Sequence, residues 1–163
     1  ATIEETTFED YDAIMNLDLK GNFFLLKLML PTMREAASGS IVFIGSDQCF
    51  VGKPHSAVYG MTKGALANLT KSTALDYAPH NIRVNCICAG TIDTPLYRNA
   101  IERYSRNSGI PLAEVEKEEA ILQPLNRVGK PEDIANLAEF LLSDKANFIT
   151  GSLIPVDGGY TAR

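Results

Sequence analysis

The stretch GSIVFIGSDQCFVGKPHSAVYGMTK, residues 39–63, decides the fold. Its first part is apolar and rich in β-branched side chains, a pattern typical of a buried strand that ends at Ser46. A loop with Gly and Pro follows, and a helical pattern then begins with Tyr59 and Lys63 four positions apart. Residues four apart share one helix face, so the phenol and the ammonium point the same way. Since open α/β sheets bind ligands at the carboxyl ends of their strands, we expect all three polar groups to converge there.

The rest of the chain alternates helix and strand. Helices are predicted over residues 8–35, 58–77, 95–106, 112–122 and 131–142, and strands over 41–46, 82–88 and 152–156. Such an order is typical of parallel strands with right-handed crossovers. Three strands make a thin sheet, and the first would leave an apolar edge unpaired. We therefore expect residues 1–163 to be the C-terminal part of a single larger α/β domain.

Composition narrows the class of protein. The chain is 45% hydrophobic and 21% charged, as in globular proteins with a real core. Its net charge of −5 and the lack of a basic cluster argue against a nucleic-acid surface. No apolar run approaches the roughly 20 residues of a membrane span. The three cysteines, Cys49, Cys86 and Cys88, are odd in number and lack metal-ligand companions, so we expect no metal, buried thiols and a cytoplasmic location.

Several further motifs accompany the opening stretch, in which Ser46 lies thirteen residues before Tyr59. They are Asn85–Cys–Ile–Cys–Ala–Gly90–Thr–Ile–Asp–Thr94, Arg127–Val–Gly–Lys–Pro–Glu–Asp–Ile134, Ile149–Thr–Gly151 and Val156–Asp–Gly–Gly159. Together these residues resemble the short-chain dehydrogenase/reductase family, in its branch of subunits of roughly 250 residues. The resemblance covers essentially the whole chain. It implies a Rossmann-type doubly wound parallel sheet whose N-terminal dinucleotide-binding half is missing from this chain.

The resemblance also implies a hydride transfer between NAD or NADP and a secondary alcohol or ketone. Tyr59 would be the general acid/base, although a free phenol titrates near 10 and needs help to lose its proton at neutral pH. Lys63 would favour the phenolate and hold the nicotinamide ribose. Ser46 would hydrogen-bond the reacting oxygen. Which dinucleotide is used, and in which direction the reaction runs, stays open.

Other positions take roles from the same resemblance. Gly90, the backbone of Ile92 and the hydroxyl of Thr94 would hold the cofactor, with the nicotinamide carboxamide at the last two. Residues 95–123 would cover the substrate as a lid. Candidate substrate contacts are Ser46, Gln48, Leu96 and Tyr97, although loop surface is an equally good interpretation of Gln48. We expect a homotetramer, as in most members of the family.

The sequence departs from the family pattern in ways that keep alternatives open. Asp18 stands where an Asn normally helps to organise the proton relay beside the lysine, and Ala89 and Gly45 replace a usual Pro and Ser. One alternative is therefore a catalytically impaired binding or regulatory protein with the same fold. An epimerase or dehydratase is disfavoured because little chain follows Val156–Asp–Gly–Gly159. We expect the 163-residue chain alone to be inactive and to bind dinucleotide weakly.

Overall fold

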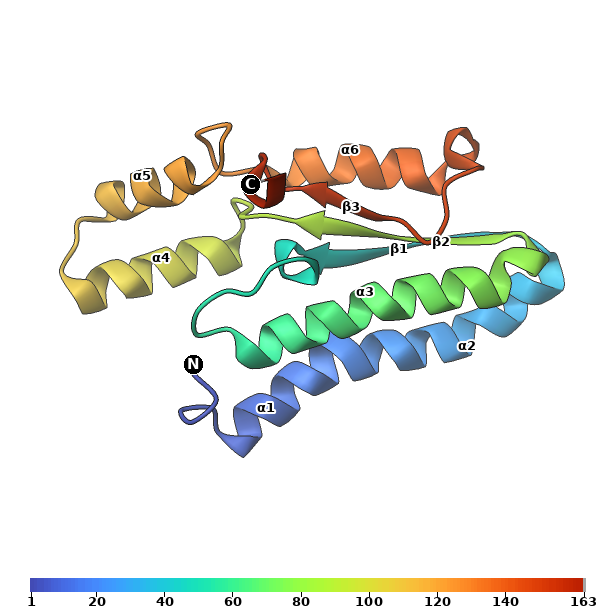
Figure 1. Cartoon of the computed structure of the whole chain (residues 1–163), viewed down its shortest axis with the longest axis horizontal. Helices are drawn as coiled ribbons and strands as arrows, with labels where there is room; N and C mark the ends of the chain where they lie inside the picture. The colour runs from blue at the N-terminus through green and yellow to red at the C-terminus, as the bar shows by residue number, and fades with distance from the viewer. Residues whose placement is uncertain (163) are drawn as a thin grey trace.

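Three parallel strands form the centre of the structure, a computed structural model that describes residues 1–162 (Figure 1). The strands are β1 (Gly39–Ser46), β2 (Ile82–Ala89) and β3 (Leu153–Val156), in the order β1-β2-β3. Ser46 pairs with Ala89, and Ala89 pairs with Val156. The carboxyl ends of all three strands therefore lie at one edge of the sheet, as the sequence predicted.

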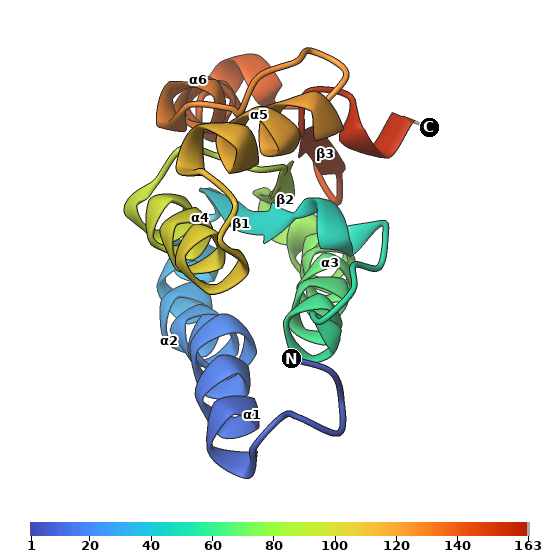
Figure 2. The same ribbon diagram turned by 90° about the vertical axis from the view of Figure 1, so that its left-hand side faces the viewer.

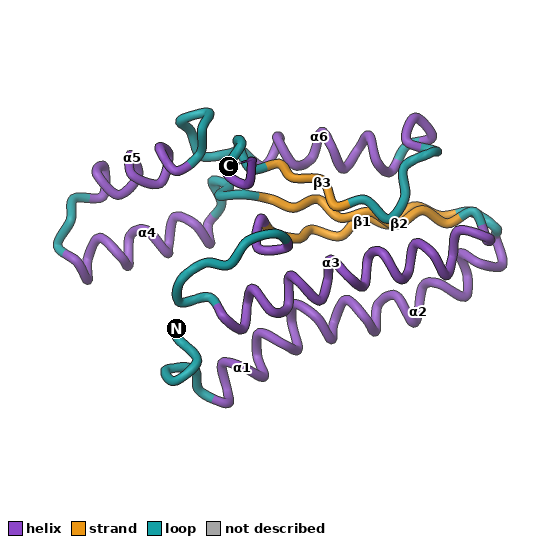
Figure 3. Tube along the Cα trace, viewed as in Figure 1, coloured by secondary structure: helices purple, strands orange, loops and turns teal. Residues whose placement is uncertain are grey.

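Helices cover both faces of this sheet. On one face lie α1 (Phe8–Met15), α2 (Gly21–Ala36) and α3 (Ala57–Tyr77), and on the other lies α6 (Pro131–Leu142). Figure 2 shows these layers end-on, and Figure 3 shows the strands between them. The helices α4 (Pro95–Ser108) and α5 (Leu112–Leu122) extend beyond the carboxyl ends of the strands. The arrangement confirms the predicted α/β fold with a parallel sheet.

The predicted helix over residues 8–35 is continuous but contains one irregularity. A π-helical turn, Asn16–Lys20, joins α1 to α2. The predicted cap at the start is confirmed, because the Thr7 hydroxyl accepts a hydrogen bond from the Asp10 backbone N–H at 3.0 Å. Single π turns inside helices occur frequently at functional sites. This turn contains Asp18, the position where the sequence departs from the family pattern.

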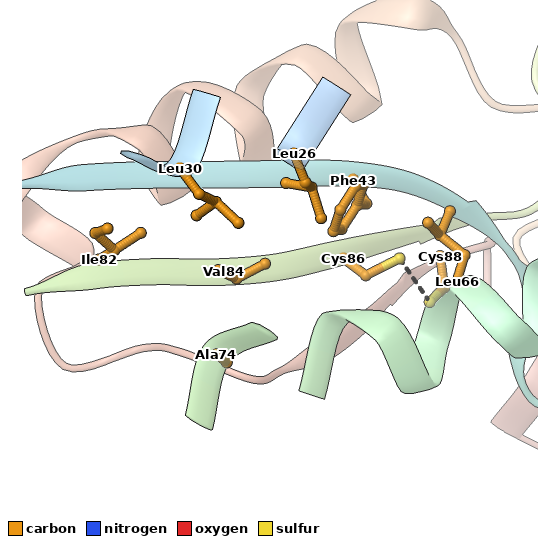
Figure 4. Packing of buried hydrophobic residues seen from close by; sticks show 9 residues of the cluster. All are labelled: Leu26, Leu30, Phe43, Leu66, Ala74, Ile82, Val84, Cys86 and Cys88. Atoms are coloured by element: carbon orange, nitrogen blue, oxygen red, sulfur yellow. Dashed lines mark hydrogen bonds between the residues drawn. The ribbon is translucent and has the colours of Figure 1, made fainter. Parts of the chain in front are cut away.

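The main core lies between the sheet and the helices α2 and α3. Side chains of β2 alternate between the two faces, so Val84 and Cys86 meet these helices while Ile87 packs under α6 with Leu141. Figure 4 shows the main cluster, which consists of Leu26, Leu30, Phe43, Leu66, Ala74, Ile82, Val84, Cys86 and Cys88. All of these side chains are buried, so this layer fixes α3 against the strands.

Leu66→Ala tests the packing of α3. The Leu66 side chain is 1% exposed, so its truncation leaves a cavity and should lower the free energy of unfolding by about 2–5 kcal/mol. The matched control is Leu75→Ala on the same helix. Leu75 is 78% exposed, and its replacement should change stability by no more than about 0.5 kcal/mol. Urea denaturation measures both variants, and equal losses would contradict the packing described here.

Strand β1 is an edge strand with apolar side chains in solvent. Within residues 1–162 it pairs only with β2, and Ile44 in its middle is 51% exposed. This confirms the expected apolar edge, which is a surface suited to pairing with another strand. The outer faces of α1 and α2 also carry exposed apolar side chains, among them Phe8, Leu17, Phe24, Leu25 and Leu28. Among the described residues, no helix is long and apolar enough to cross a membrane.

Candidate active site

Ser46 ends β1 in an extended conformation and is buried. Its hydroxyl donates a hydrogen bond to Asp47 Oδ1 at 2.9 Å and accepts one from the Gln48 backbone N–H at 3.2 Å. The strand places this hydroxyl at the sheet edge beside Ala89, because the two residues are register partners. The predicted position of Ser46 at the carboxyl end of the strand is therefore correct.

Tyr59 and Lys63 lie in the first turns of α3, on one face of the helix. The Lys63 ammonium is 5.1 Å from the centre of the Tyr59 ring, as the spacing of four predicted. Lys63 is buried despite its charge. The loop from Asp47 to Ser56 turns the chain back so that α3 starts near the end of β1 (Figure 1). The side chains of Tyr59 and Ser46 interact, so the structure brings the three predicted catalytic residues together.

Asp18 reaches the same site from the π-helical turn. Its carboxylate oxygen Oδ1 lies 3.6 Å from Lys63 Nζ, an ion pair in which the ammonium is almost fully buried. The backbone carbonyl of Asp18 accepts a hydrogen bond from the Asn22 side-chain amide at 2.8 Å. Asn22 thus supplies an amide donor inside the irregular turn that Asp18 itself lacks. The carboxylate instead neutralises the lysine charge directly.

Burial is the main influence on the Tyr59 phenol. It raises the pKa of the phenol above the usual value near 10, because the ionised form is less well solvated there. The interaction with the Ser46 side chain acts in the opposite direction, whereas the negative charges of Asp18 and Asp47 add to the increase. Without a bound cation, Tyr59 therefore holds its proton at neutral pH.

A titration tests this electrostatic picture. The difference in phenolate absorbance between the wild-type chain and Tyr59→Phe should have a midpoint above pH 10 in the absence of dinucleotide. The fold favours the neutral phenol, so this stabilisation is complete below about pH 10 and is lost as the pH rises through the folded-state pKa. A midpoint below 10 would show that the cationic Lys63 already outweighs burial.

The loop after β2 holds the predicted cofactor residues at the same sheet edge. A Cβ atom at Gly90 would lie 2.7 Å from Asp157 Cα, so only glycine fits between the ends of β2 and β3. The backbone of Ile92 forms an isolated parallel bridge with Gly129. The Thr94 hydroxyl caps α4 by accepting from the Tyr97 backbone N–H at 3.3 Å. Because a hydroxyl that accepts still has a proton to donate, Thr94 retains a free donor function.

The predicted substrate residues lie farther apart than the predicted catalytic residues do. The Gln48 carbonyl oxygen Oε1 is buried and has no hydrogen-bond partner within residues 1–162. Leu96 on α4 is 81% exposed. Tyr97 lines a cavity between α4 and α5 together with Ile101 and Leu112. The structure therefore keeps Gln48 beside Ser46 but places Leu96 and Tyr97 on the helix beyond the sheet edge.

Sequence reasoning missed Asp47, which is a neighbour of the site. Its buried carboxylate accepts from Ser46 through Oδ1, and Oδ2 lies 2.6 Å from Lys53 Nζ. The same ammonium lies 4.5 Å above the Tyr160 ring, which connects this loop to the C-terminal turn. The sequence does contain a signal for this contact: Asp47 directly follows Ser46, and Lys53 comes six positions after Asp47.

The sequence predicted no metal-ligand companions for the three cysteines, and the structure brings their thiols together. The sulfur atoms of Cys49, Cys86 and Cys88 all lie within 4.8 Å of one another, and no disulfide joins them. Cys86 and Cys88 project from the same face of β2, as their spacing predicted. The chain after Ser46 brings Cys49 over that face. Spacing in sequence could not show this, because the contact depends on the path of the loop.

The chain is similar to known proteins in sequence and in fold. Residues 1–161 match the sequence model of a family described as enoyl-(acyl carrier protein) reductase. Over 162 residues the chain is 38% identical to cis-4-hydroxycyclohexanecarboxylate dehydrogenase of Sinomonas cyclohexanicum, covering 99% of this chain and 61% of that protein. The chain spans about 60% of the length of the curated relatives it matches.

Two solved structures have the same fold. The crystal structure of a short chain dehydrogenase family protein from Francisella tularensis superposes with a TM-score of 0.94 at 47% identity, covering 99% of this chain and 66% of that chain. ElxO with NADP bound superposes with a TM-score of 0.87 at 31% identity, and the match covers 99% of this chain and 62% of the ElxO chain.

Proposed function

Because the chain belongs to the short-chain dehydrogenase/reductase family, we propose that it carries the catalytic residues of an NAD(P)-dependent oxidoreductase acting on a secondary alcohol or ketone. The observation that supports this most directly is the convergence of Ser46, Tyr59 and Lys63 at the carboxyl edge of the sheet. The Ser46 hydroxyl can hold a carbonyl oxygen, the Tyr59 phenol can protonate it, and the Lys63 ammonium can stabilise the phenolate that results.

Tyr59 is the proton donor and acceptor in this proposal. In the reducing direction its phenol protonates the carbonyl oxygen, and in the oxidising direction its phenolate takes the proton of the alcohol. Because burial raises the pKa of Tyr59, the phenol carries its proton in the free site and can donate it to a carbonyl oxygen. The ammonium of Lys63 stabilises the phenolate that remains after proton transfer. Ser46 positions the reacting oxygen by donating a hydrogen bond, which requires its hydroxyl to turn away from Asp47.

The bound nicotinamide would supply or accept the hydride. The chain's polar groups suit such a ligand: Lys63 would donate to the ribose hydroxyls, and the Ile92 backbone and Thr94 hydroxyl would hold the carboxamide. Gly90 fits this arrangement, because the close contact with Asp157 fixes the backbone of the loop that carries both groups. Gln48 is the substrate contact nearest to Ser46 in the chain. NAD and NADP are equally compatible with these residues.

One observation favours the second candidate, a catalytically impaired binding or regulatory protein. The Asp18 carboxylate lies beside the Lys63 ammonium, where it competes for the charge that should stabilise the Tyr59 phenolate. Asp18→Asn distinguishes the two proposals. An active enzyme should change its turnover by less than about tenfold, because the Asp18 carboxylate is partly exposed and, at 3.6 Å from Lys63 Nζ, forms an ion pair of only about 1 kcal/mol. If the wild-type protein is inactive and Asp18→Asn gains turnover, the impaired protein is the correct description.

The assay that tests the proposal uses the full-length protein with NADH and NADPH across a panel of ketones. We expect loss of the reduced dinucleotide's absorbance with at least one ketone. Dinucleotide binding without any turnover across the panel would favour the binding protein.

We also propose that residues 95–123 act as a lid and that the protein assembles as a homotetramer. The exposed apolar side chains of α2 and α3, such as Leu28 and Leu75, support an interface on these helices. Light scattering of the full-length protein measures the assembly, and a monomer would contradict it.

A further inference from the structure

Three cysteine thiols meet directly beside the catalytic residues. Cys86 and Cys88 are fully buried on β2, and their sulfur atoms are 4.0 Å apart, as the dashed line in Figure 4 marks. Cys49 is half-buried, and its thiol donates to the Lys63 backbone carbonyl oxygen at 3.3 Å. Because all three sulfurs lie within 4.8 Å of one another, a single atom placed between them would touch all three.

Gly45 leaves the space in which these sulfurs meet. A Cβ atom built at this position would lie 2.6 Å from Cys86 Sγ and 2.9 Å from Cys49 Sγ, well inside normal contact distance. Any side chain at residue 45 would therefore push at least one sulfur out of the cluster. The glycine that departs from the family pattern is thus a requirement of the thiol cluster.

The spacing of the sulfurs suits a metal ion better than a disulfide. An ion with metal–sulfur bonds of about 2.3 Å in a tetrahedral site requires sulfur–sulfur distances of about 3.8 Å. The sulfur atoms of Cys86 and Cys88 are already close to this separation, at 4.0 Å. A disulfide bond is only about 2.05 Å long, so the sulfurs of Cys86 and Cys88 would have to approach each other by about 2 Å to form one.

We propose that Cys49, Cys86 and Cys88 form a three-thiolate site for a thiophilic divalent cation of the zinc group. Binding of Zn²⁺ replaces the three thiol protons, which leave to solvent, and forms three zinc–sulfur bonds. The bound cluster carries one net negative charge. The fourth position of the ion opens on the side of Cys49, the only partly exposed member, where a water molecule completes the coordination.

Titration of the fully reduced chain with Cd²⁺ alone, without oxygen, tests this site. Cadmium thiolates absorb in the near ultraviolet, so the absorbance counts the bonds formed. We expect saturation at one Cd²⁺ per chain, a Kd of about 10⁻⁶ M or tighter, and release of three protons for each ion bound. Added Zn²⁺ should displace Cd²⁺ and abolish the absorbance.

Gly45→Ser is the decisive variant because it keeps all three thiols and removes only the space between them. It should weaken Cd²⁺ binding at least about 100-fold, as loss of the site geometry does in metal proteins. The matched control is Gly52→Ser in the loop that follows β1, where an added Cβ meets no atom within 4 Å and binding should be unchanged. If Gly45→Ser does not fold, Cys49→Ser serves instead and should remove one third of the absorbance and weaken binding similarly.

Three outcomes would overturn the proposal. One is equal Cd²⁺ affinity in Gly45→Ser and the wild type, and another is equal affinity in folded and urea-unfolded chain. The third is an absence of cadmium–thiolate absorbance together with a loss of two hydrogens in mass on exposure to air. That last result would identify the cluster as a pair of oxidisable thiols.

Discussion

Tyr59→Phe is expected to reduce turnover of the full-length protein by about 10³-fold, since general acid–base catalysis contributes about 10²–10⁴. The phenol shares a helix face with Lys63 and interacts with Ser46, so its oxygen is the one that can reach a carbonyl held by the serine. The ring itself remains, and with it the packing at the start of α3. Steady-state rates with a ketone from the panel measure the effect.

The control for this variant is Tyr77→Phe at the other end of α3. Tyr77 packs against the main core and the His80 ring, far from the carboxyl edge of the sheet. Its replacement should leave turnover unchanged within about twofold. Dinucleotide binding by Tyr59→Phe should also persist, because the proposed cofactor contacts come from Lys63, Ile92 and Thr94. Turnover above about one tenth of the wild-type rate in Tyr59→Phe would remove the tyrosine from its role.

Lys63→Met is expected to damage both binding and chemistry. Loss of a charged hydrogen bond costs about 1.5–3 kcal/mol, so the KM for dinucleotide should rise about 10- to 150-fold. Turnover should fall as well, because the phenolate of Tyr59 loses the cation that stabilises it. Methionine keeps most of the buried volume, and the Asp18 carboxylate left behind is partly exposed, so the fold should survive. Initial rates at varied dinucleotide concentration separate the two effects.

Lys71→Met is the matched control, because this lysine lies on the same helix and is exposed. It should change neither KM nor kcat. A KM in Lys63→Met that equals the wild-type value would show that the ammonium does not contact the cofactor. Lys63 would then act only on the Tyr59 phenol and not on the cofactor.

Strands and helices were predictable here because local pattern and tertiary packing agree. The run from Ile41 to Ser46 is apolar because it crosses the core, and the structure extends β1 to Gly39 through pairing with Ile82. That extension depends on partners far away in sequence, including a hydrogen bond from the Ser40 hydroxyl to the Leu141 carbonyl. The π-helical turn at Asn16–Lys20 was not predictable, because one wide turn leaves the helical periodicity of the side chains almost intact.

In the site, too, local pattern predicted some features and the path of the chain decided the others. The strand end and the helix face fix the directions of three side chains, so the sequence was enough to predict Ser46, Tyr59 and Lys63. The contacts of Asp47 with Lys53, and of Cys49 with Cys86 and Cys88, depend on a loop path that local sequence does not determine. The contacts of Cys49 with Cys86 and Cys88 are possible because Gly45 has no side chain. Hydrophobic periodicity does not reveal such a space, because it depends on which side chains are present.

The most direct test of the central claim is isotope transfer. Full-length protein is supplied with a ketone and with NADH or NADPH in which both hydrogens at the reactive carbon of the nicotinamide are replaced by deuterium, and the product alcohol is examined by mass spectrometry. We expect one deuterium on the carbinol carbon of the product, and no labelled product with Tyr59→Phe. An alcohol formed without deuterium at that carbon, or labelled product formed equally well by Tyr59→Phe, would contradict the claim.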